Sequence, residues 1–210
     1  MSTADPLFSP LGPTTGDVTA LRARLGDAAA AEQLVDVAVT TLDSPVGNLL
    51  LAATERGLVR VAYTDHDGGA DAVLEDLSTR ISPRVLERRS ALDQALRELD
   101  GYFAGSLQAF DLALDLRLAQ GFRRRVVDSL RGIPYGRTST YAAVAAEAGS
   151  PRAVRAVGTA CALNPLPLVV PCHRVVRSDG TPGQYAGGAE VKRRLLALER
   201  QSGPTAGSLR

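Results

Sequence analysis

Residues 163–188 read LNPLPLVVPCHRVVRSDGTPGQYAGG, a segment rich in proline and glycine that differs from the remainder of the chain. Its prolines exclude a continuous helix, and the apolar run at 168–170 predicts a short buried strand that leads to Cys172 and His173. A cysteine held beside a histidine is a candidate nucleophile, because thiolate is the reactive form and a nearby imidazole favours it. The alternative is that Cys172 is a small core residue, as buried free cysteines often are.

The cysteine content leaves this thiol as the candidate for sulfur chemistry. The 210-residue chain has two cysteines and two histidines, too few for a disulfide scaffold or a convincing structural zinc site. The other cysteine, Cys161, falls on the apolar side of a predicted helix and is interpreted as packing. We therefore expect a free thiol at Cys172, with no metal and no cofactor.

Just upstream, the sequence predicts two short helices joined by a Gly-Ser-Pro turn. A Ser-Thr pair can cap a helix over 141–148, and a Ser-Pro pair is expected to begin the next helix at Pro151. Arg152, Arg155 and Thr159 project from this second helix, away from its apolar stripe. The layout is that of a helix-turn-helix, although helical hairpins that touch no DNA can show the same pattern.

The N-terminal half has a mixed α and β pattern. Apolar runs separated by the turns SPVGN and ERG predict a three-stranded meander over 35–41, 49–54 and 58–63. Periodicity predicts helices over 70–77 and 85–103, a half-buried strand over 110–116 and a helix over 122–130.

These elements predict an α+β fold in two domains. Residues 35–118 form a small N-terminal α/β domain with an antiparallel sheet, and residues 119–201 form a helical, winged-helix-like domain with the helix-turn-helix. Residues 1–34 are an extension of unknown role, in which a short helix from an Asp17 cap is expected, and residues 202–210 are a tail.

Composition excludes several classes of protein. With 45% hydrophobic and 22% charged residues, the chain is globular, and no window approaches the roughly 18 consecutive apolar residues of a membrane span. The first thirty residues lack a secretory signal, so we expect a cytoplasmic protein without membrane association.

Charge is distributed unevenly along the chain. Residues 1–120 hold 10 arginines against 18 acidic residues, whereas residues 121–210 hold 14 basic against 5 acidic residues. A basic half of this kind favours a polyanionic partner such as nucleic acid. The alternative is a general preference for arginine in an Ala/Arg-rich sequence.

Several motifs together resemble a known family. They are PCHRV at 171–175, RAVG at 155–158, NP at 164–165, the loop GQYAGG at 183–188, and Lys192, Leu195, Leu196 and Glu199. They closely resemble the O6-alkylguanine-DNA alkyltransferases, also called methylated-DNA–protein-cysteine methyltransferases. The similarity is dense over 121–200, and SPVGNL at 44–49 with GLVRV at 57–61 resembles the N-terminal domain of that family.

The resemblance implies direct-reversal repair of double-stranded DNA that contains O6-alkylguanine, and also O4-alkylthymine. The alkyl group would move irreversibly to Cys172, so that each molecule, a monomer in solution, acts once; cooperative assembly on DNA stays open. A relay of Cys172, a bridging water, His173 and Glu199 would generate the thiolate, and Asn164 would brace the segment that carries Cys172.

Glu199 can also be weighed from its spacing. In a predicted helix over 189–200, Val191, Leu195 and Leu198 form the apolar side, and Glu199 lies next to it. A carboxylate in that position is expected to have a partner. The alternative is a solvated glutamate at a frayed helix end.

The resemblance further implies that the damaged nucleotide rotates out of the duplex. Arg155 would intercalate in its place and Tyr141 would push on its phosphate, with the second helix in the minor groove; a solvated arginine and a core aromatic are the alternatives. Further residues expected at the DNA are Arg152, Ala156 and Thr159. The guanine pocket is expected to be lined by Val175, Tyr185, Ala186, Gly187 and Gly188.

One departure and two rival functions stay open. Ala186 stands where some relatives offer a hydroxyl, so the preference between methyl and bulkier adducts is undetermined. A lesion-binding module would need no thiol. A cysteine hydrolase would use Cys172 and His173, but no oxyanion-hole arrangement can be named.

Overall fold

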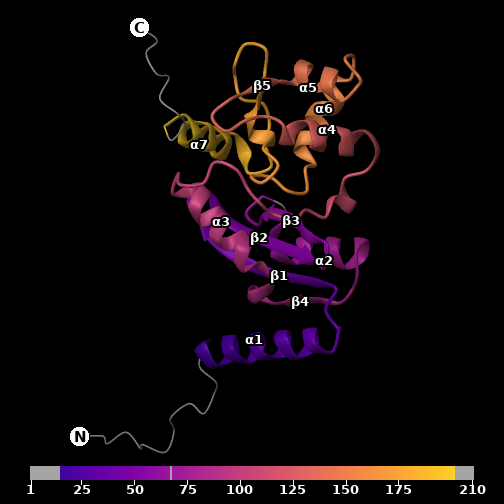
Figure 1. The fold of residues 1–210 in the computed structure, drawn as a ribbon, viewed down its shortest axis with the longest axis vertical. Coiled ribbons are helices and arrows are strands. Elements are labelled where there is room, and N and C mark those ends of the chain that lie inside the picture. The colour runs from indigo at the N-terminus through magenta and orange to yellow at the C-terminus, as the bar shows by residue number, and fades with distance from the viewer. Residues whose placement is uncertain (1–14, 67, 202–210) are drawn as a thin grey trace, which may run out of the picture.

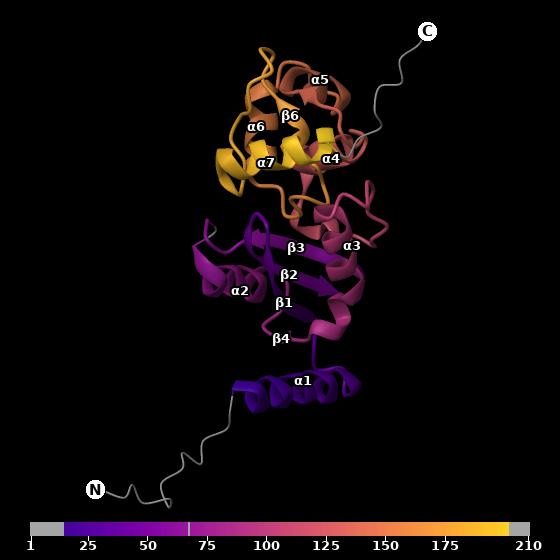
Figure 2. The same cartoon turned by 90° about the vertical axis from the view of Figure 1, so that its left-hand side faces the viewer.

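A sheet-based half and a helical half stack along the long axis of the molecule in this computed structural model, which describes residues 15–66 and 68–201 (Figure 1). Turned by 90°, the sheet lies between α1 (Thr15–Ala31) and the C-terminal helices (Figure 2). The mixed architecture confirms the predicted α+β fold class.

The N-terminal half is a four-stranded sheet in the order β3-β2-β1-β4. The predicted meander is confirmed: β1 (Val37–Ser44), β2 (Gly47–Thr54) and β3 (Gly57–Tyr63) pair antiparallel in sequence order. A fourth strand, β4 (Val85–Glu87), was not predicted and pairs parallel with β1.

Both faces of the sheet are covered, which explains the continuous apolar run at 49–52. Leu50 and Ala52 pack in one cluster with α2 (Gly69–Arg80). Leu49 and Leu51 point to the other side, into a larger cluster with α3 (Asp93–Phe103) and the helical half.

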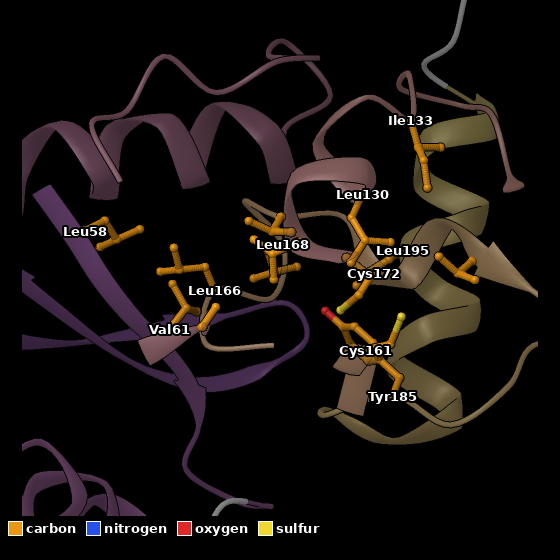
Figure 3. Close-up of a cluster of buried hydrophobic side chains, with 14 of the residues drawn as sticks. Leu58, Val61, Leu130, Ile133, Cys161, Leu166, Leu168, Cys172, Tyr185 and Leu195 are labelled. Atoms are coloured by element: carbon orange, nitrogen blue, oxygen red, sulfur yellow. The ribbon is translucent and has the colours of Figure 1, made fainter. Parts of the chain in front are cut away.

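The larger core is continuous between the two halves. Leu58 and Val61 of β3 belong to the same cluster as Leu166 and Leu168, which come from the segment just before Cys172 (Figure 3). The backbone N–H of Val61 also donates to the carbonyl of Pro165, at 2.9 Å. The sheet therefore supports the segment that carries Cys172, and the domain boundary expected near residue 118 stays a prediction.

Two predicted elements of the N-terminal half are wrong. The helix expected over 85–103 begins only at Asp93, after β4 and a 3-10 turn, η1 (Arg89–Leu92), because pairing with the β1 edge outweighs local periodicity. The strand expected over 110–116 is irregular: it contacts β3 through the bridge between Leu58 and Leu114, and Asp115 then caps η2 (Leu116–Leu118).

The helical half contains the four helices α4 (Gly121–Arg131), α5 (Tyr141–Glu147), α6 (Val154–Ala162) and α7 (Gly188–Gln201). Thr140 caps α5 as predicted, accepting from the N–H of Ala143 at 3.1 Å. The start expected for the next helix at Pro151 is wrong, because the Ala153 N–H donates to the Ser150 carbonyl and closes a turn there. A two-stranded parallel pair, β5 (Ser139–Thr140) and β6 (Val175–Val176), completes this half.

The N-terminal helix is longer than expected. It begins at Thr15 and ends at Ala31, so the start expected at Asp17 is wrong and this position lies within the helix. Residues 1–14 of the extension and the tail at 202–210 lie outside the described residues. No helix in the described part of the chain has the length and apolar character that crossing a membrane would need.

Candidate active site

Cys172 begins a single 3-10 turn, η3 (Cys172–Arg174), which leads directly into β6. The strand predicted at 168–170 is wrong: this segment is a turn, in which Leu168 has a positive φ of 74°. Prolines on both sides of the segment deprive the backbone of donors, so no strand pairing forms there.

Asn164 holds this turn in place. Its side-chain Nδ2 donates to the carbonyl of Val170 at 2.9 Å, and its Oδ1 accepts from the N–H of Leu166 at 3.1 Å. Asn164 is 3% exposed, so both contacts lie away from solvent. The side chain thus closes a loop that ends two residues before Cys172, and its role as a brace stays a prediction.

The thiol of Cys172 is buried among polar and aromatic neighbours. It is 1% exposed and belongs to the same core cluster as Cys161 and Tyr185, all three of which are drawn in Figure 3. Burial raises the pKa of the Cys172 thiol to about 11, while Asn164 and Lys192 act in the opposite direction. In this closed arrangement the thiol is therefore protonated at neutral pH, and a base must take its proton.

Glu199 is the centre of a buried hydrogen-bond network. Its Oε1 lies 2.8 Å from Nε2 of His173 and accepts from the hydroxyl of Tyr102 at 2.8 Å. Arg174 donates from Nε to Oε2 at 2.9 Å and from Nη2 to Oε1 at 2.9 Å, and the N–H of Gly136 donates to Oε2 at 3.2 Å. The expectation that this carboxylate has a partner is confirmed, and a solvated helix end is excluded.

These donors keep Glu199 ionised. Burial alone would raise the pKa of Glu199, but the hydrogen bonds from His173 and Arg174 outweigh it and lower the pKa to about 2. A carboxylate this weakly basic does not take a proton at neutral pH. It can instead orient the imidazole and stabilise its charged form, the role of the acid in a catalytic triad.

His173 is fully buried, and its two ring nitrogens differ. Because Nε2 faces an ionised carboxylate, the hydrogen-bond network assigns the ring proton to Nε2. Nδ1 is buried and has no hydrogen-bond partner within the described part of the chain. Burial lowers the pKa of His173, opposed by Glu199, so the ring is neutral and Nδ1 is free to accept a proton.

The buried face of α7 differs from the one predicted. Lys192, Leu195 and Glu199 are buried at spacing i, i+3, i+7, whereas Val191 and Leu198 are only half-buried. Of the expected apolar side, Leu195 alone lies on the buried face, which also carries two charged residues. Lys192 is fully buried, and its Nζ donates to the carbonyl of Val175 at 2.6 Å.

Sequence reasoning missed three members of this site. Arg174 stands inside the PCHRV motif, where a cation beside the histidine was a readable signal for a carboxylate partner. Lys192 could have been found from its i, i+3, i+7 relation to Leu195 and Glu199. Tyr102 gave no signal beyond an apolar helix face, because its partner lies 97 residues away in sequence.

The residues expected to line a guanine pocket lie close to this network. Val175 and Tyr185 are buried, and the ring centroid of Tyr185 lies 6.1 Å from that of His173. Ala186 and Gly188 are half-buried, and Gly187 is buried. Their part in binding a base stays a prediction.

The residues expected at the DNA lie on a different surface. Arg155, Ala156 and Thr159 are exposed on α6, and Arg152 is exposed in the turn before it, not on the helix as expected. Tyr141 is half-buried at the start of α5, and its hydroxyl approaches Gly183 so closely that a Cβ there would collide with it. The structure thus exposes Arg155 and Thr159 on a face of α6 that also carries the apolar Val154 and Ala156, and it places Tyr141 against the loop that follows β6.

The described residues contain no cluster of three or more His, Cys, Asp or Glu side chains placed to hold a metal ion. The side chains that meet at the site are a thiol, a neutral imidazole, an ionised carboxylate and the Arg174 guanidinium that pairs with it.

Comparison with known proteins places these features in a family. Residues 37–116 match the family model for the ribonuclease-like domain of 6-O-methylguanine DNA methyltransferase, and residues 121–201 match the model for its DNA binding domain. A methylated-DNA–protein-cysteine methyltransferase of Mycolicibacterium paratuberculosis is 42% identical over 164 residues, covering 78% of this chain and 93% of the relative.

Solved structures show the same similarity. The crystal structure of O6-methylguanine methyltransferase from Mycobacterium tuberculosis superposes with a TM-score of 0.70 at 37% identity, covering 80% of this chain and 96% of that one. The Mycobacterium tuberculosis OGT in complex with DNA gives 0.69 at 37% identity, with the same coverage of both chains. This chain therefore belongs to the methylated-DNA–protein-cysteine methyltransferase family.

Proposed function

We propose that this chain repairs alkylated DNA by transferring the alkyl group from O6 of guanine, and from O4 of thymine, to Sγ of Cys172. The observation that carries the proposal is the buried network in which Glu199 fixes His173 with Nδ1 unpaired, one residue from a buried thiol. The names of the relatives support a cysteine as the acceptor, and the DNA complex of a relative supports DNA as the partner.

The reaction starts with proton transfer from the thiol. The neutral His173 takes the proton of Cys172 at Nδ1 through a bridging water, and the resulting imidazolium is stabilised by the Glu199 carboxylate. Arg174 and Tyr102 hold that carboxylate, so its orientation does not change during the step.

Alkyl transfer is then a direct displacement. The thiolate electron pair forms a bond to the alkyl carbon, the bond from that carbon to O6 breaks, and its electron pair stays on the guanine, which takes up a proton. The thioether product has no leaving group that water can displace readily, so we expect the transfer to be irreversible and each molecule to act once.

The target base must reach a thiol that is 1% exposed. We therefore propose that the nucleotide is rotated out of the duplex, at an unstacking cost of a few kcal/mol. Arg155, on the exposed face of α6, would fill the gap, and Tyr141, at the start of α5, would direct the target's phosphate.

We place the remaining DNA contacts at the exposed residues on α6 and in the turn before it. Arg152, Ala156 and Thr159 lie beside Arg155 in sequence and are exposed, as a helix-turn-helix docked against DNA requires. Phosphate contacts of this kind bind without sequence preference and weaken as salt increases. We propose that the protein acts as a monomer on double-stranded DNA.

The test is to mix the protein with an excess of duplex DNA containing O6-methylguanine and to measure its mass. We expect each molecule to gain the mass of one CH2 group, on the peptide that contains Cys172, and then to stop. Binding without a mass gain would instead indicate a lesion sensor. A Cys172→Ala variant that still became methylated would contradict the assignment of the acceptor.

A further inference from the structure

We propose that Tyr63, at the end of β3, determines which O6-alkyl groups the protein accepts, because it holds the wall formed by Tyr185 and Gly187. This inference rests on the proposed function and assigns a specificity role to the N-terminal sheet. Tyr63 lies more than 100 residues before Cys172 in sequence and is 1% exposed.

Tyr63 is joined to Tyr185 by two kinds of contact. The hydroxyl oxygens of the two side chains are 3.0 Å apart and form a buried hydrogen bond. Their ring centroids are 5.7 Å apart with an interplanar angle of 71°, an edge-to-face packing. The hydrogen bond thus holds the hydroxyl of Tyr185, and the ring packing holds its aromatic ring.

Gly187 rests directly on the ring of Tyr63. A Cβ atom at position 187 would lie 2.8 Å from Cε1 and 2.9 Å from Cζ of Tyr63, which is closer than real side-chain contacts allow. The backbone of the loop has therefore approached the ring as far as a glycine permits. While Tyr63 is present, this loop cannot move toward the sheet.

This support matters because Tyr185 lies beside the reacting groups. Its ring packs edge-on to His173, with centroids 6.1 Å apart, and it shares the core cluster of Cys172. An alkyl group larger than methyl, carried toward Cys172 on a guanine, needs the wall at 185–187 to recede. Tyr63 resists that movement, so its size and its hydroxyl are expected to favour small alkyl groups.

The experiment compares transfer rates from two duplexes, one with O6-methylguanine and one with O6-benzylguanine. Tyr63→Ala opens the space behind the loop, and we expect it to raise the benzyl-to-methyl rate ratio about tenfold, the scale on which pockets discriminate by size. Tyr63→Phe keeps the ring but leaves the buried Tyr185 hydroxyl without this partner, and we expect a rise of about threefold.

The matched control is Val59→Ala, a fully buried residue of the same strand whose side chain packs in the opposite cluster, with α2. It is expected to lower thermal stability without changing the rate ratio. An unchanged ratio in Tyr63→Ala, or an equal change in Val59→Ala, would overturn the inference.

The two proposals fail in distinguishable ways. If the wild-type protein transfers neither group to Cys172, the proposed function is wrong. If the wild type transfers methyl but the Tyr63 variants keep its rate ratio, only the role of Tyr63 is wrong. Should Tyr63→Ala not fold, Tyr63→Phe decides, since it preserves the packed ring, and an unchanged ratio in that variant overturns the inference.

Discussion

The hydroxyl of Tyr102 in α3 donates a hydrogen bond to Oε1 of Glu199 in α7, at 2.8 Å. The same oxygen lies 2.8 Å from Nε2 of His173, so one carboxylate oxygen serves both side chains. Burial, together with the nearby carboxylate, raises the pKa of Tyr102, which keeps it a proton donor. A residue of the sheet-based half thereby helps to orient the carboxylate behind His173.

Removing this hydroxyl should change the pH dependence of transfer. In Tyr102→Phe, the Glu199 carboxylate loses a hydrogen-bond donor that partly neutralises its charge. It then stabilises the protonated form of His173 more strongly, which raises the pKa of His173. Since transfer needs neutral His173, the acidic limb of the pH–rate profile should move to higher pH, and rates on that limb should fall about three- to tenfold. The measurement is single-turnover methyl transfer as a function of pH.

A purely structural role for Tyr102 predicts a different result. Phe103→Leu, at the neighbouring half-buried position of α3, should lower the free energy of unfolding without moving the acidic limb. If Tyr102→Phe likewise leaves the limb in place, Tyr102 only packs and does not tune Glu199.

The buried His173–Glu199 pair should give stability a two-step pH dependence. The folded-state pKa of His173 is lowered from 6.5, so the unfolded chain binds more protons, and stability falls as pH decreases below about 6.5. The pKa of Glu199 is lowered from 4.5 to about 2, so its contribution, present above about pH 4.5, is lost as pH falls toward 2. Urea unfolding between pH 8 and pH 3 measures both steps.

His173→Gln separates the two steps. Glutamine keeps a donor for Glu199 but does not titrate, so stability should become nearly flat between about pH 6.5 and pH 4.5, while the fall below pH 4.5 persists. If the free energy of unfolding of His173→Gln fell between about pH 6.5 and pH 4.5 as steeply as that of the wild type, another group would titrate in that range.

Asn164 offers a prediction about the segment that carries Cys172. Asn164→Ala removes the acceptor for the Leu166 N–H, which is left unpaired, and one of two donors to the Val170 carbonyl, which keeps the N–H of Cys172 at 2.8 Å. We expect the free energy of unfolding to fall by about 1–3 kcal/mol and methyl transfer to slow, because Cys172 lies two residues after the Val170 carbonyl that Asn164 holds. Asn164→Asp, which keeps only the acceptor, should lie between the wild type and the alanine variant; equal stability of all three would contradict the bracing role.

Some elements and site residues can be predicted from local sequence patterns, and others depend on contacts between distant parts of the chain. The meander and the helix cap at Thr140 follow from local patterns, and the PCHRV motif makes Cys172 and His173 candidates for the reacting groups. Glu199 was predicted through resemblance and spacing, yet its burial beside Lys192 depended on how α7 rotates against its neighbours. Tyr63 and Tyr102 could not be predicted, because each meets its partner across the interface between the halves, where local periodicity carries no information.

Contacts between residues distant in sequence also explain why two predicted elements are wrong. The apolar spacing after residue 87 predicts a helix that includes residues 85–87. These residues instead pair with the edge of β1, because the backbone hydrogen bonds of that edge are available to them. The apolar residues at 168–170 are typical of a buried strand. The hydrogen bond from Asn164 to Val170, and the packing of Leu168 in the core cluster that contains β3, show that this segment is instead a buried turn.

Arg155 should separate DNA handling from thiol chemistry. It is exposed on α6, so Arg155→Ala should change the free energy of unfolding by less than about 0.5 kcal/mol, as surface substitutions usually do. Transfer from O6-methylguanine in a duplex should slow at least tenfold, because the gap left by the rotated nucleotide is no longer filled and the flipped state is less populated. Reaction with the free base O6-benzylguanine needs no flipping, so its rate should match that of wild type.

Arg124→Ala, at an exposed arginine of α4 held by Asp128, is the matched control for charge loss and should leave both rates unchanged. If the duplex and free-base rates of Arg155→Ala fell together, Arg155 would act on the thiol site and not on the DNA.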